Sequence, residues 1–425
     1  MSETDRLLHW LESERDRQLD FLQQFARIDT ANPPGDTRRA ADFFRAFLDR
    51  EGISHRTEAP QAAHPNLIAT FDGGVDPGSG KSRHLVLNGH LDVFPVGDRA
   101  AWARDPWSGE IADGRVHGRG TVDMKCGTTA LLFVFAYLYR LRAELPGRVT
   151  LTVVSDEETG GKWGAAWLIE NKPAEVLGDC VLNTEPSGLA TVRFGEKCML
   201  WLRFHIAVKG GHSAYPHTGG SANKVAATLI HDLQAVEAMV PEEPATVRAT
   251  LDRSEVARAA DLSLGAGAAE VMRRVSVNIG TMQGGVKINM LPAECVLEVD
   301  FRLPVGITRA AVLAKVTAIV ARYSGVSFEE LLPGGPEATV SDPTHEMMGH
   351  LLRHAGAGLP APAQPIVSLG GTDTRFWRVK GVPAFVYGCS PAGMGGVDES
   401  VSIAEFHHVL RVHALAARDY LMAGR

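Results

Sequence analysis

The sequence contains 425 residues, of which 45% are apolar and 22% are charged, and its formal net charge is −7. This length predicts two or three domains with cores of their own, and the composition excludes a disordered chain. The negative charge argues against nucleic acid or an anionic membrane as the main partner. Five scattered cysteines argue against a disulfide framework or a thiolate zinc site, whereas 16 histidines are present. Any bound metal should therefore have nitrogen and oxygen ligands.

We expect no targeting signal at the start of the chain. Residues 1–6 include charged side chains, and no apolar signal-peptide region follows them. The most apolar run, Ala130–Tyr139, is about half as long as a segment that spans a bilayer. We therefore expect a soluble, cytoplasmic protein without membrane association.

The first part of the chain predicts a domain of alternating strands and helices. Apolar residues at helical spacing predict one amphipathic helix over residues 5–28, which ends before the turn signal at 32–35. The strands predicted next are 67–71, 84–88, 148–155 and 180–183, and the helices are 126–142 and 164–170. This alternation predicts an α/β sandwich around a largely parallel sheet.

The pattern changes near residue 198. Residues 200–209 alternate between apolar and mixed positions, which is typical of a half-exposed strand in an antiparallel sheet. The elements predicted after it are a helix at 221–239, strands at 275–281 and 293–301, a helix at 308–323 and a strand at 326–331. This order, β-α-β-β-α-β, is that of a ferredoxin-like domain. We predict that a domain at 198–333 is inserted into a larger one formed by 1–197 and 334–425, and we assign no role to the Ala-rich residues 241–267.

Histidine and acidic residues follow the predicted strands of the larger domain or lie in the turn before its apolar helix. They are His90, Asp92, Asp123, Glu157, Glu158 and Glu185. Because open α/β sheets place their sites outside the carboxyl ends of parallel strands, we expect these turns to converge. Carboxylates packed together raise each other's pKa, and a divalent cation removes that penalty. Nitrogen and oxygen ligands suit Zn²⁺, Mn²⁺ or Co²⁺.

Individual roles follow from the spacing. Asp92 can accept the second ring N–H of His90 and so fix the tautomer that binds a metal. Glu157 and Glu158 are adjacent at a strand end, so that one can face the metal and the other a water activated by it. Taken alone, such a histidine is more often simply packed in a core, and a Glu-Glu pair is usually solvated surface. The prediction depends on the combination of four turns.

Further motifs accompany these turns, namely Gly118-Arg-Gly-x-x-Asp123-Met-Lys, Gly211-His212 and Gly370-Gly-Thr-Asp373. With them the chain resembles, over almost its whole length, the dinuclear metal amidohydrolase and peptidase family of acetylornithine deacetylase, succinyl-diaminopimelate desuccinylase, aminoacylase and glutamate carboxypeptidase. The resemblance implies a zinc-peptidase-like α/β/α catalytic domain with an inserted ferredoxin-like lid, through which the chain forms a homodimer.

The resemblance also implies a role for each matching residue. It makes His90, Asp123 and Glu185 the ligands of one metal, and it makes Asp123 and Glu158 ligands of a second. Glu157 then corresponds to the general base, and Asp92 to the residue that orients His90.

A second group of matching residues concerns the substrate. The resemblance implies that His212 reaches into the partner subunit's site and stabilises the developing oxyanion. It places Asn289, Arg302, Gly371, Thr372 and Asp373 near the substrate's carboxylate. Arg302 could equally form an ion pair with Asp300.

The sequence departs from the family pattern at one position. Relatives close the second metal site with a histidine four residues before the glutamate of Asp398-Glu399, and that position is Gly395 here. A two-metal site completed by another ligand, a single-metal enzyme and an altered chemistry all remain open. We hypothesise one or two metals per subunit, with the site of His90, Asp123 and Glu185 the tighter one.

The resemblance implies a metal-dependent hydrolase of a C–N bond in a small molecule, either an N-acyl amino acid or a small peptide-like amide. Activated water would attack the amide with Glu157 as general base. One alternative is a hydrolytic aminohydrolase that deaminates an aromatic or activated amine on the same fold. Another is a non-catalytic dimeric binding protein whose metal site has decayed. The identity of the substrate stays open.

Overall fold

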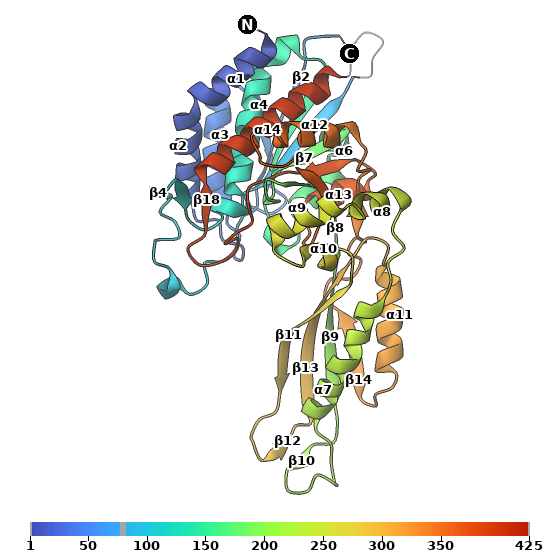
Figure 1. Ribbon diagram of the computed structural model, residues 1–425. Coiled ribbons are helices and arrows are strands. Elements are labelled where there is room, and N and C mark those ends of the chain that lie inside the picture. Colours follow the sequence, from blue (N-terminus) through green and yellow to red (C-terminus); the bar gives the residue numbers. More distant parts are fainter. Residues whose placement is uncertain (1, 77–81, 424–425) are drawn as a thin grey trace.

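The computed structural model describes residues 2–76 and 82–423. A narrow lid projects from a larger α/β domain, and both chain termini lie at the opposite end of the larger domain from the lid (Figure 1). The chain first enters the lid at residue 198 and finally leaves it after residue 330. The predicted insertion of a small domain into a larger one is therefore visible in the chain path.

A nine-stranded sheet forms the centre of the larger domain, in the order β1-β2-β6-β3-β7-β17-β8-β15, with β16 paired to β8 beside this path. Its strands are β1 (His55–Glu58), β2 (Asn66–Asp72), β3 (His84–His90), β6 (Arg148–Val154), β7 (Cys180–Asn183), β8 (Thr191–Glu196), β15 (Thr339–Val340), β16 (Gln364–Ser368) and β17 (Ala384–Val386). The central neighbours β6, β3, β7 and β17 are parallel, whereas β1, β2 and β15 pair antiparallel. The predicted parallel sheet is thus parallel at its centre and mixed as a whole.

Helices cover both faces of this sheet. The larger core lies under α1 (Glu3–Ser13), α2 (Arg15–Ala26), α3 (Arg38–Arg50), α4 (Cys126–Leu141), α12 (Glu346–Ala355) and α14 (Ile403–Met422). The opposite face packs against α5 (Ala165–Asn171), α6 (Pro173–Val176) and α13 (Thr374–Val379). Glu14 leaves helical geometry (φ −105°, ψ 17°), so the helix predicted for residues 5–28 is two helices.

The apolar helix α4 lies inside the larger domain. The segment Thr121–Glu144 has the length and composition to cross a membrane, but all of its most apolar stretch is buried in the protein. Its side chains fill the space between the sheet and the N-terminal helices. A helix that is apolar on all sides and buried in this way is a core helix of a globular domain.

The lid contains the predicted ferredoxin-like arrangement. Its antiparallel sheet has the order β11-β13-β9-β14, and its two long helices enclose a separate core against that sheet. The elements are β9 (Cys198–Ala207), α7 (Ala222–Leu233), β11 (Ser276–Gly284), β13 (Glu294–Leu303), α11 (Arg309–Val320) and β14 (Val326–Glu330). At the far end of the lid, β10 (Gly211–His212) pairs with β12 (Met290–Leu291).

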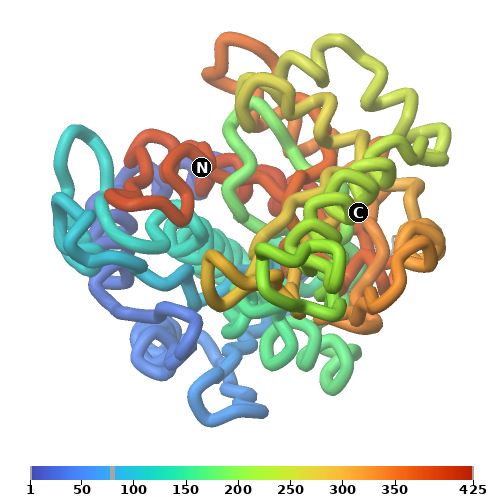
Figure 2. Tube along the Cα trace, turned by 90° about the horizontal axis from the view of Figure 1, so that it is seen from below, coloured from blue at the N-terminus to red at the C-terminus, as the bar shows by residue number. Residues whose placement is uncertain are grey.

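Three helices within the range 198–333 belong by packing to the larger domain. They are α8 (Ala245–Leu251), α9 (Ser254–Leu264) and α10 (Ala268–Val271). Val247, Leu251, Val256 and Ala260 join the core of the larger domain, and both views place these helices outside the lid sheet (Figures 1 and 2). The Ala-rich segment therefore leaves the lid, packs against the larger domain and returns.

A small sheet ties the C-terminal part of the chain to the turn before α4. It consists of β4 (Glu110–Ala112), β5 (Arg115–His117) and β18 (Ser400–Ser402) in the order β18-β5-β4. The N–H of Gly118 also donates to the carbonyl of Glu399 at 2.9 Å. Residues far apart in sequence are thereby fixed beside Asp123.

All five cysteines are free and buried.

Candidate metal centre and active site

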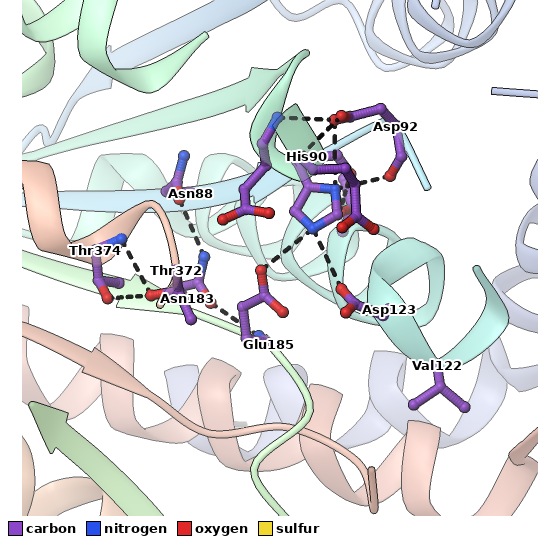
Figure 3. Close-up of polar contacts among 12 residues, drawn as sticks. Asn88, His90, Asp92, Val122, Asp123, Asn183, Glu185, Thr372 and Thr374 are labelled. Atoms are coloured by element: carbon purple, nitrogen blue, oxygen red, sulfur yellow. Dashed lines mark hydrogen bonds and ion pairs between the residues drawn. The ribbon is translucent and has the colours of Figure 1, made fainter. Parts of the chain in front are cut away.

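Three side chains from three elements meet at the carboxyl ends of the central strands. His90 is the last residue of β3, Glu185 follows β7, and Asp123 lies in the turn before α4 (Figure 3). The Nε2 atom of His90 is 3.3 Å from Asp123 Oδ1 and 3.2 Å from Glu185 Oε1. One potential ligand atom from each residue lies within 4.8 Å of the others. The expected convergence of these turns is present.

The ring of His90 is oriented by the backbone. Its Nδ1 lies 2.8 Å from the main-chain oxygen of Asp92, whereas the nearest carboxylate oxygen of Asp92 is 3.6 Å away. Because a peptide oxygen can only accept, Nδ1 carries a proton, and Nε2 is the ring atom that faces Asp123 and Glu185. The nearer acceptor is therefore the main-chain carbonyl, rather than the carboxylate that the sequence suggested.

The carboxylate of Asp92 instead holds the turn that carries the two adjacent glutamates. It accepts hydrogen bonds from Asn32 Nδ2 at 2.8 Å and from the main-chain N–H groups of Glu157 and Glu158 at 3.2 and 3.1 Å. Asp156 begins this turn with φ +75°, a conformation uncommon for a residue with a side chain. Asp92 thus positions His90 through its backbone and both glutamates through its side chain.

Glu185 is held by a row of asparagines. Its N–H donates to Asn183 Oδ1 at 2.8 Å, and Asn183 Nδ2 donates to Asn88 Oδ1 at 3.0 Å (Figure 3). Asn88 and Asn183 are buried residues of the neighbouring strands β3 and β7. This row links the strand that carries His90 to the one that precedes Glu185.

The buried ionisable groups at this site fit a bound cation. Burial raises the pKa of Glu185 and Glu158 well above the usual value, and the charge of Asp123 raises it further. Burial lowers the pKa of His90, but its contacts with Asp123 and Glu185 outweigh this and raise it. His90 Nε2, Asp123 Oδ1 and Glu158 Oε1 are buried without a hydrogen-bond partner. A divalent metal would neutralise the carboxylates and use these atoms, so one imidazole and two carboxylates fit such an ion.

Arg375 lies against the predicted general base. Its Nη1 donates to Glu157 Oε1 at 3.2 Å, and its Nη2 donates to the carbonyl of Gly160 at 3.1 Å. Burial raises the pKa of Glu157, and the charge of Arg375 opposes that rise. Sequence reasoning missed this arginine, although it stands two residues beyond the motif that ends at Asp373.

The loop at 370–373 is anchored from the root of the lid. Glu196, the last residue of β8, accepts from the N–H of Thr372 at 3.0 Å and from its hydroxyl at 2.9 Å. Asp373 is buried with no hydrogen-bond partner for either carboxylate oxygen, and burial followed by the charge of Glu157 raises its pKa well above the usual value. Asp373 stands two residues before Arg375, which contacts the predicted base, and Glu196 is a second residue that the sequence reasoning missed.

Two predicted site residues lie elsewhere within one chain. His212 belongs to β10 and Asn289 precedes β12, so both are exposed at the end of the lid farthest from the larger domain (Figure 1). Arg302 in β13 donates from Nε to Asp300 Oδ2 at 2.9 Å, which is the ion pair that the sequence left open. A single chain does not bring His212 or Asn289 to the metal-ligand cluster.

Residues 86–419 match the model of peptidase family M20/M25/M40. The chain belongs to this family. Succinyl-diaminopimelate desuccinylase from Cereibacter sphaeroides is 29% identical over 390 residues, which cover 90% of this chain and 93% of that protein. Among solved structures, the M20 metallo-carboxypeptidase Sso-CP2 from Sulfolobus solfataricus has a TM-score of 0.77 at 17% identity and covers 97% of this chain and 100% of its own. The Bacillus subtilis YXEP protein, a dinuclear metal-binding peptidase, has a TM-score of 0.62 at 17% identity, with coverages of 97% and 99%.

Membership of the M20 family confirms the expected enzyme class and fold. This chain is a metal-dependent hydrolase that acts on C–N amide bonds. Its α/β catalytic domain and inserted lid are those of the family's solved structures. The buried cluster of His90, Asp123 and Glu185 fits the metal site of such an enzyme.

An aromatic ring lies beside the position of the missing histidine. Gly395 has φ +69°, and a Cβ atom built there would lie 3.2 Å from Cδ2 of Phe94. The buried carboxylate of Glu399 already has partners, because it accepts from Arg119 Nη1 at 2.6 Å and from the N–H of Val122 at 2.9 Å. Among the described residues, the group of three metal-ligating side chains does not include Glu158. Position 395 itself contributes no ligand, because it is a glycine.

Proposed function

We propose that this M20 hydrolase deacylates an N-acyl amino acid or cleaves a small peptide-like amide. The buried cluster of His90, Asp123 and Glu185 next to the Glu157–Arg375 pair is the observation that carries the proposal. A divalent metal held by the cluster would polarise the amide carbonyl and lower the pKa of water. Zn²⁺, Mn²⁺ and Co²⁺ all suit this donor set.

The residues around the cluster then have different roles in the reaction. Glu157 accepts a proton from the attacking water and returns it to the leaving amine, and its burial in the site suits a carboxylate to this exchange. Arg375 holds one oxygen of Glu157 in place, and Asp92 holds the turn on which Glu157 stands. Asp92 is a positioning residue because it acts only through His90 and the two glutamates.

We assign substrate binding to the loop at Gly371, Thr372 and Asp373, and to Asn289 and Arg302. The loop directly precedes Arg375, which contacts Glu157, and this supports a position near the bond to be cleaved. The N–H and the hydroxyl of Thr372 both donate hydrogen bonds to Glu196, so Thr372 contributes by fixing the conformation of the loop. Arg302 would bind a substrate carboxylate in exchange for Asp300.

We also propose a homodimer formed through the lid. Val286 and Ile288 near the lid tip are 91% and 99% exposed, and Met282 and Met290 beside them are about half exposed. β11 is an edge strand of the lid sheet, and most of its residues are exposed. A second copy would cover this apolar surface and could bring His212 of the partner subunit to the metal centre. The free, buried cysteines support a reducing, cytoplasmic location.

Protein purified without chelator should contain about one tightly bound metal ion per chain. The reason is that Glu158 lies outside the group of possible metal ligands found among the described residues, and that position 395 offers no side chain, with Phe94 beside it. Elemental analysis by mass spectrometry checks this, with the His90→Ala variant as a control that should lose the ion. Two tightly held ions per chain would contradict the prediction.

The reaction itself is tested with N-acyl amino acids, dipeptides and aromatic amines in the presence of Zn²⁺, Mn²⁺ or Co²⁺. We expect an amide to be hydrolysed to a carboxylic acid and an amine, and chelation to abolish the reaction. Release of ammonia without a carboxylic acid would instead identify an aminohydrolase. If every compound is bound but none is cleaved, the protein is a binding protein and the proposal is wrong.

A further inference from the structure

A pocket of about 450 Å³ lies at the root of the lid. It is lined by the turn after Glu157, by residues of the loop at 370–373 and of α13, and by the segments where the chain first enters and finally leaves the lid. Small-molecule sites commonly have volumes of about 300–1,000 Å³. This pocket can therefore hold a whole side chain or acyl group of a substrate.

The pocket adjoins the proposed base through Arg375. Arg375, which donates to Glu157, forms part of its wall, and so do Gly160 and Gly371. The side chain of Met199 reaches the same place, because a Cβ atom built on Gly371 would lie 3.3 Å from Met199 Cε. A substrate amide at Glu157 could extend a neighbouring group into this space.

The wall is mainly apolar. Its apolar side chains are Met199, Leu331, Leu332, Pro333 and Phe376. They come from the first strand of the lid, from the segment that leaves the lid and from α13. Apolar side chains from three elements thus face one space.

The charged side chains of the wall already have partners inside the protein. Glu196 accepts from Thr372, Lys197 donates to the carbonyls of Val271 and Arg274, Glu337 accepts from the N–H of Arg309, and Arg375 donates to Glu157. Lys162 lies at the exposed rim, over the ring of Trp163. A charged group that entered the pocket would lose water and would have to displace one of these contacts.

From this arrangement we infer that the pocket binds an apolar group of the substrate, either an aromatic or a branched aliphatic side chain. The preferred substrates are then N-acyl amino acids or small peptides with such a side chain, and substrates with a second charged group are poor. The inference rests on the proposed function and specifies the substrate class at the same site. Met199 and Phe376 become determinants of specificity.

A substrate panel tests the inference on the wild-type enzyme loaded with metal. The compounds are N-acetyl-L-phenylalanine, N-acetyl-L-leucine, N-acetyl-L-glutamate and N-succinyl-L,L-diaminopimelate. We expect kcat/KM for the two apolar compounds to exceed that for the two charged ones at least about tenfold, since a pocket discriminates by the groups it buries. Equal values, or higher values for the charged compounds, would overturn the inference.

A variant with a charge in the pocket gives an independent result. Met199→Lys should lower kcat/KM for N-acetyl-L-phenylalanine about tenfold or more while sparing N-acetyl-L-glutamate, so that the ratio between them falls. Val240→Lys places the same residue at an exposed position outside the pocket and should leave the ratio unchanged. Equal losses for both substrates in Met199→Lys would show a purely structural effect and would count against the inference.

Binding without turnover separates this inference from the proposed function. Calorimetric titration of the metal-loaded Glu157→Gln variant with the same compounds should give tighter binding of the apolar ones. If the wild type cleaves no amide but this preference is found, the proposed function is wrong and the pocket assignment stands. If amides are cleaved and the charged compounds bind as tightly as the apolar ones, the proposed function stands and the pocket assignment is wrong.

Discussion

Replacement of Glu157 by glutamine should lower kcat about 10²–10⁴-fold and leave the metal content unchanged. Glutamine keeps the size of the side chain and can still contact Arg375, but its amide cannot accept the proton of the attacking water. Glu157 does not belong to the buried cluster of His90, Asp123 and Glu185, so the ion should remain bound. Steady-state kinetics on the most active amide, together with elemental analysis, measure both quantities.

A matched substitution distinguishes the loss of a base from a general effect of removing a carboxylate. Glu170→Gln changes the same residue type at an exposed position on α5 and should keep the activity of the wild type. Turnover near that of the wild type in Glu157→Gln would refute the assignment of the base. Loss of metal from that variant would instead place Glu157 among the ligands.

The convergence of the metal ligands could be predicted because it depends on strand ends. His90 and Glu185 follow neighbouring parallel strands, and such strands end at the same edge of the sheet. Asp123 lies in a turn held by Glu399 and by the small sheet of β18, β5 and β4, so its place depends on chain from the far end of the sequence. Asp123 was predicted as a metal ligand from the Gly118–Lys125 motif, and the spacing of apolar residues gave no information about it.

Arg375 and Glu196 could not be predicted from their own surroundings in the sequence. Arg375 meets Glu157 across 218 residues, and Glu196 meets Thr372 across 176 residues. Both contacts depend on how α13 and β8 pack in the larger domain, which local propensity does not encode. The loop motif that ends at Asp373 was a usable signal, because residues just beyond a binding loop are held close to it.

Two elements of the fold also differ from those predicted from the sequence. The segment 241–267 has no clear apolar period, because α8–α10 are short and bury only a few side chains such as Val247 and Val256 against the larger domain. The predicted helix at 5–28 is interrupted at Glu14, whose carboxylate accepts hydrogen bonds from Arg17 and Arg140. The apolar spacing at helical period does not reveal this break.

Replacement of His212 by alanine should lower kcat about 10²–10³-fold, the usual effect of removing one donor to a developing oxyanion. The N–H of Ala214 donates to His212 Nδ1 at 3.2 Å, so the proton of the ring stands on Nε2. The ring is exposed at the lid tip and makes no contact with the metal-ligand cluster of its own chain. We propose that this N–H acts in the site of the partner subunit, so KM should change far less than kcat.

Mixing two inactive variants tests that assignment directly. In a mixed dimer of His212→Ala and Glu157→Gln, one site combines an intact Glu157 with His212 of the partner subunit, while the other site lacks both. Random exchange of subunits from equal amounts should therefore restore about a quarter of the wild-type activity, because half of the dimers are mixed and each has one working site. Sedimentation velocity verifies that the wild type is a dimer. If activity stays at the level of the separate variants although subunits exchange, His212 does not act across the interface, and a single chain must close its own site.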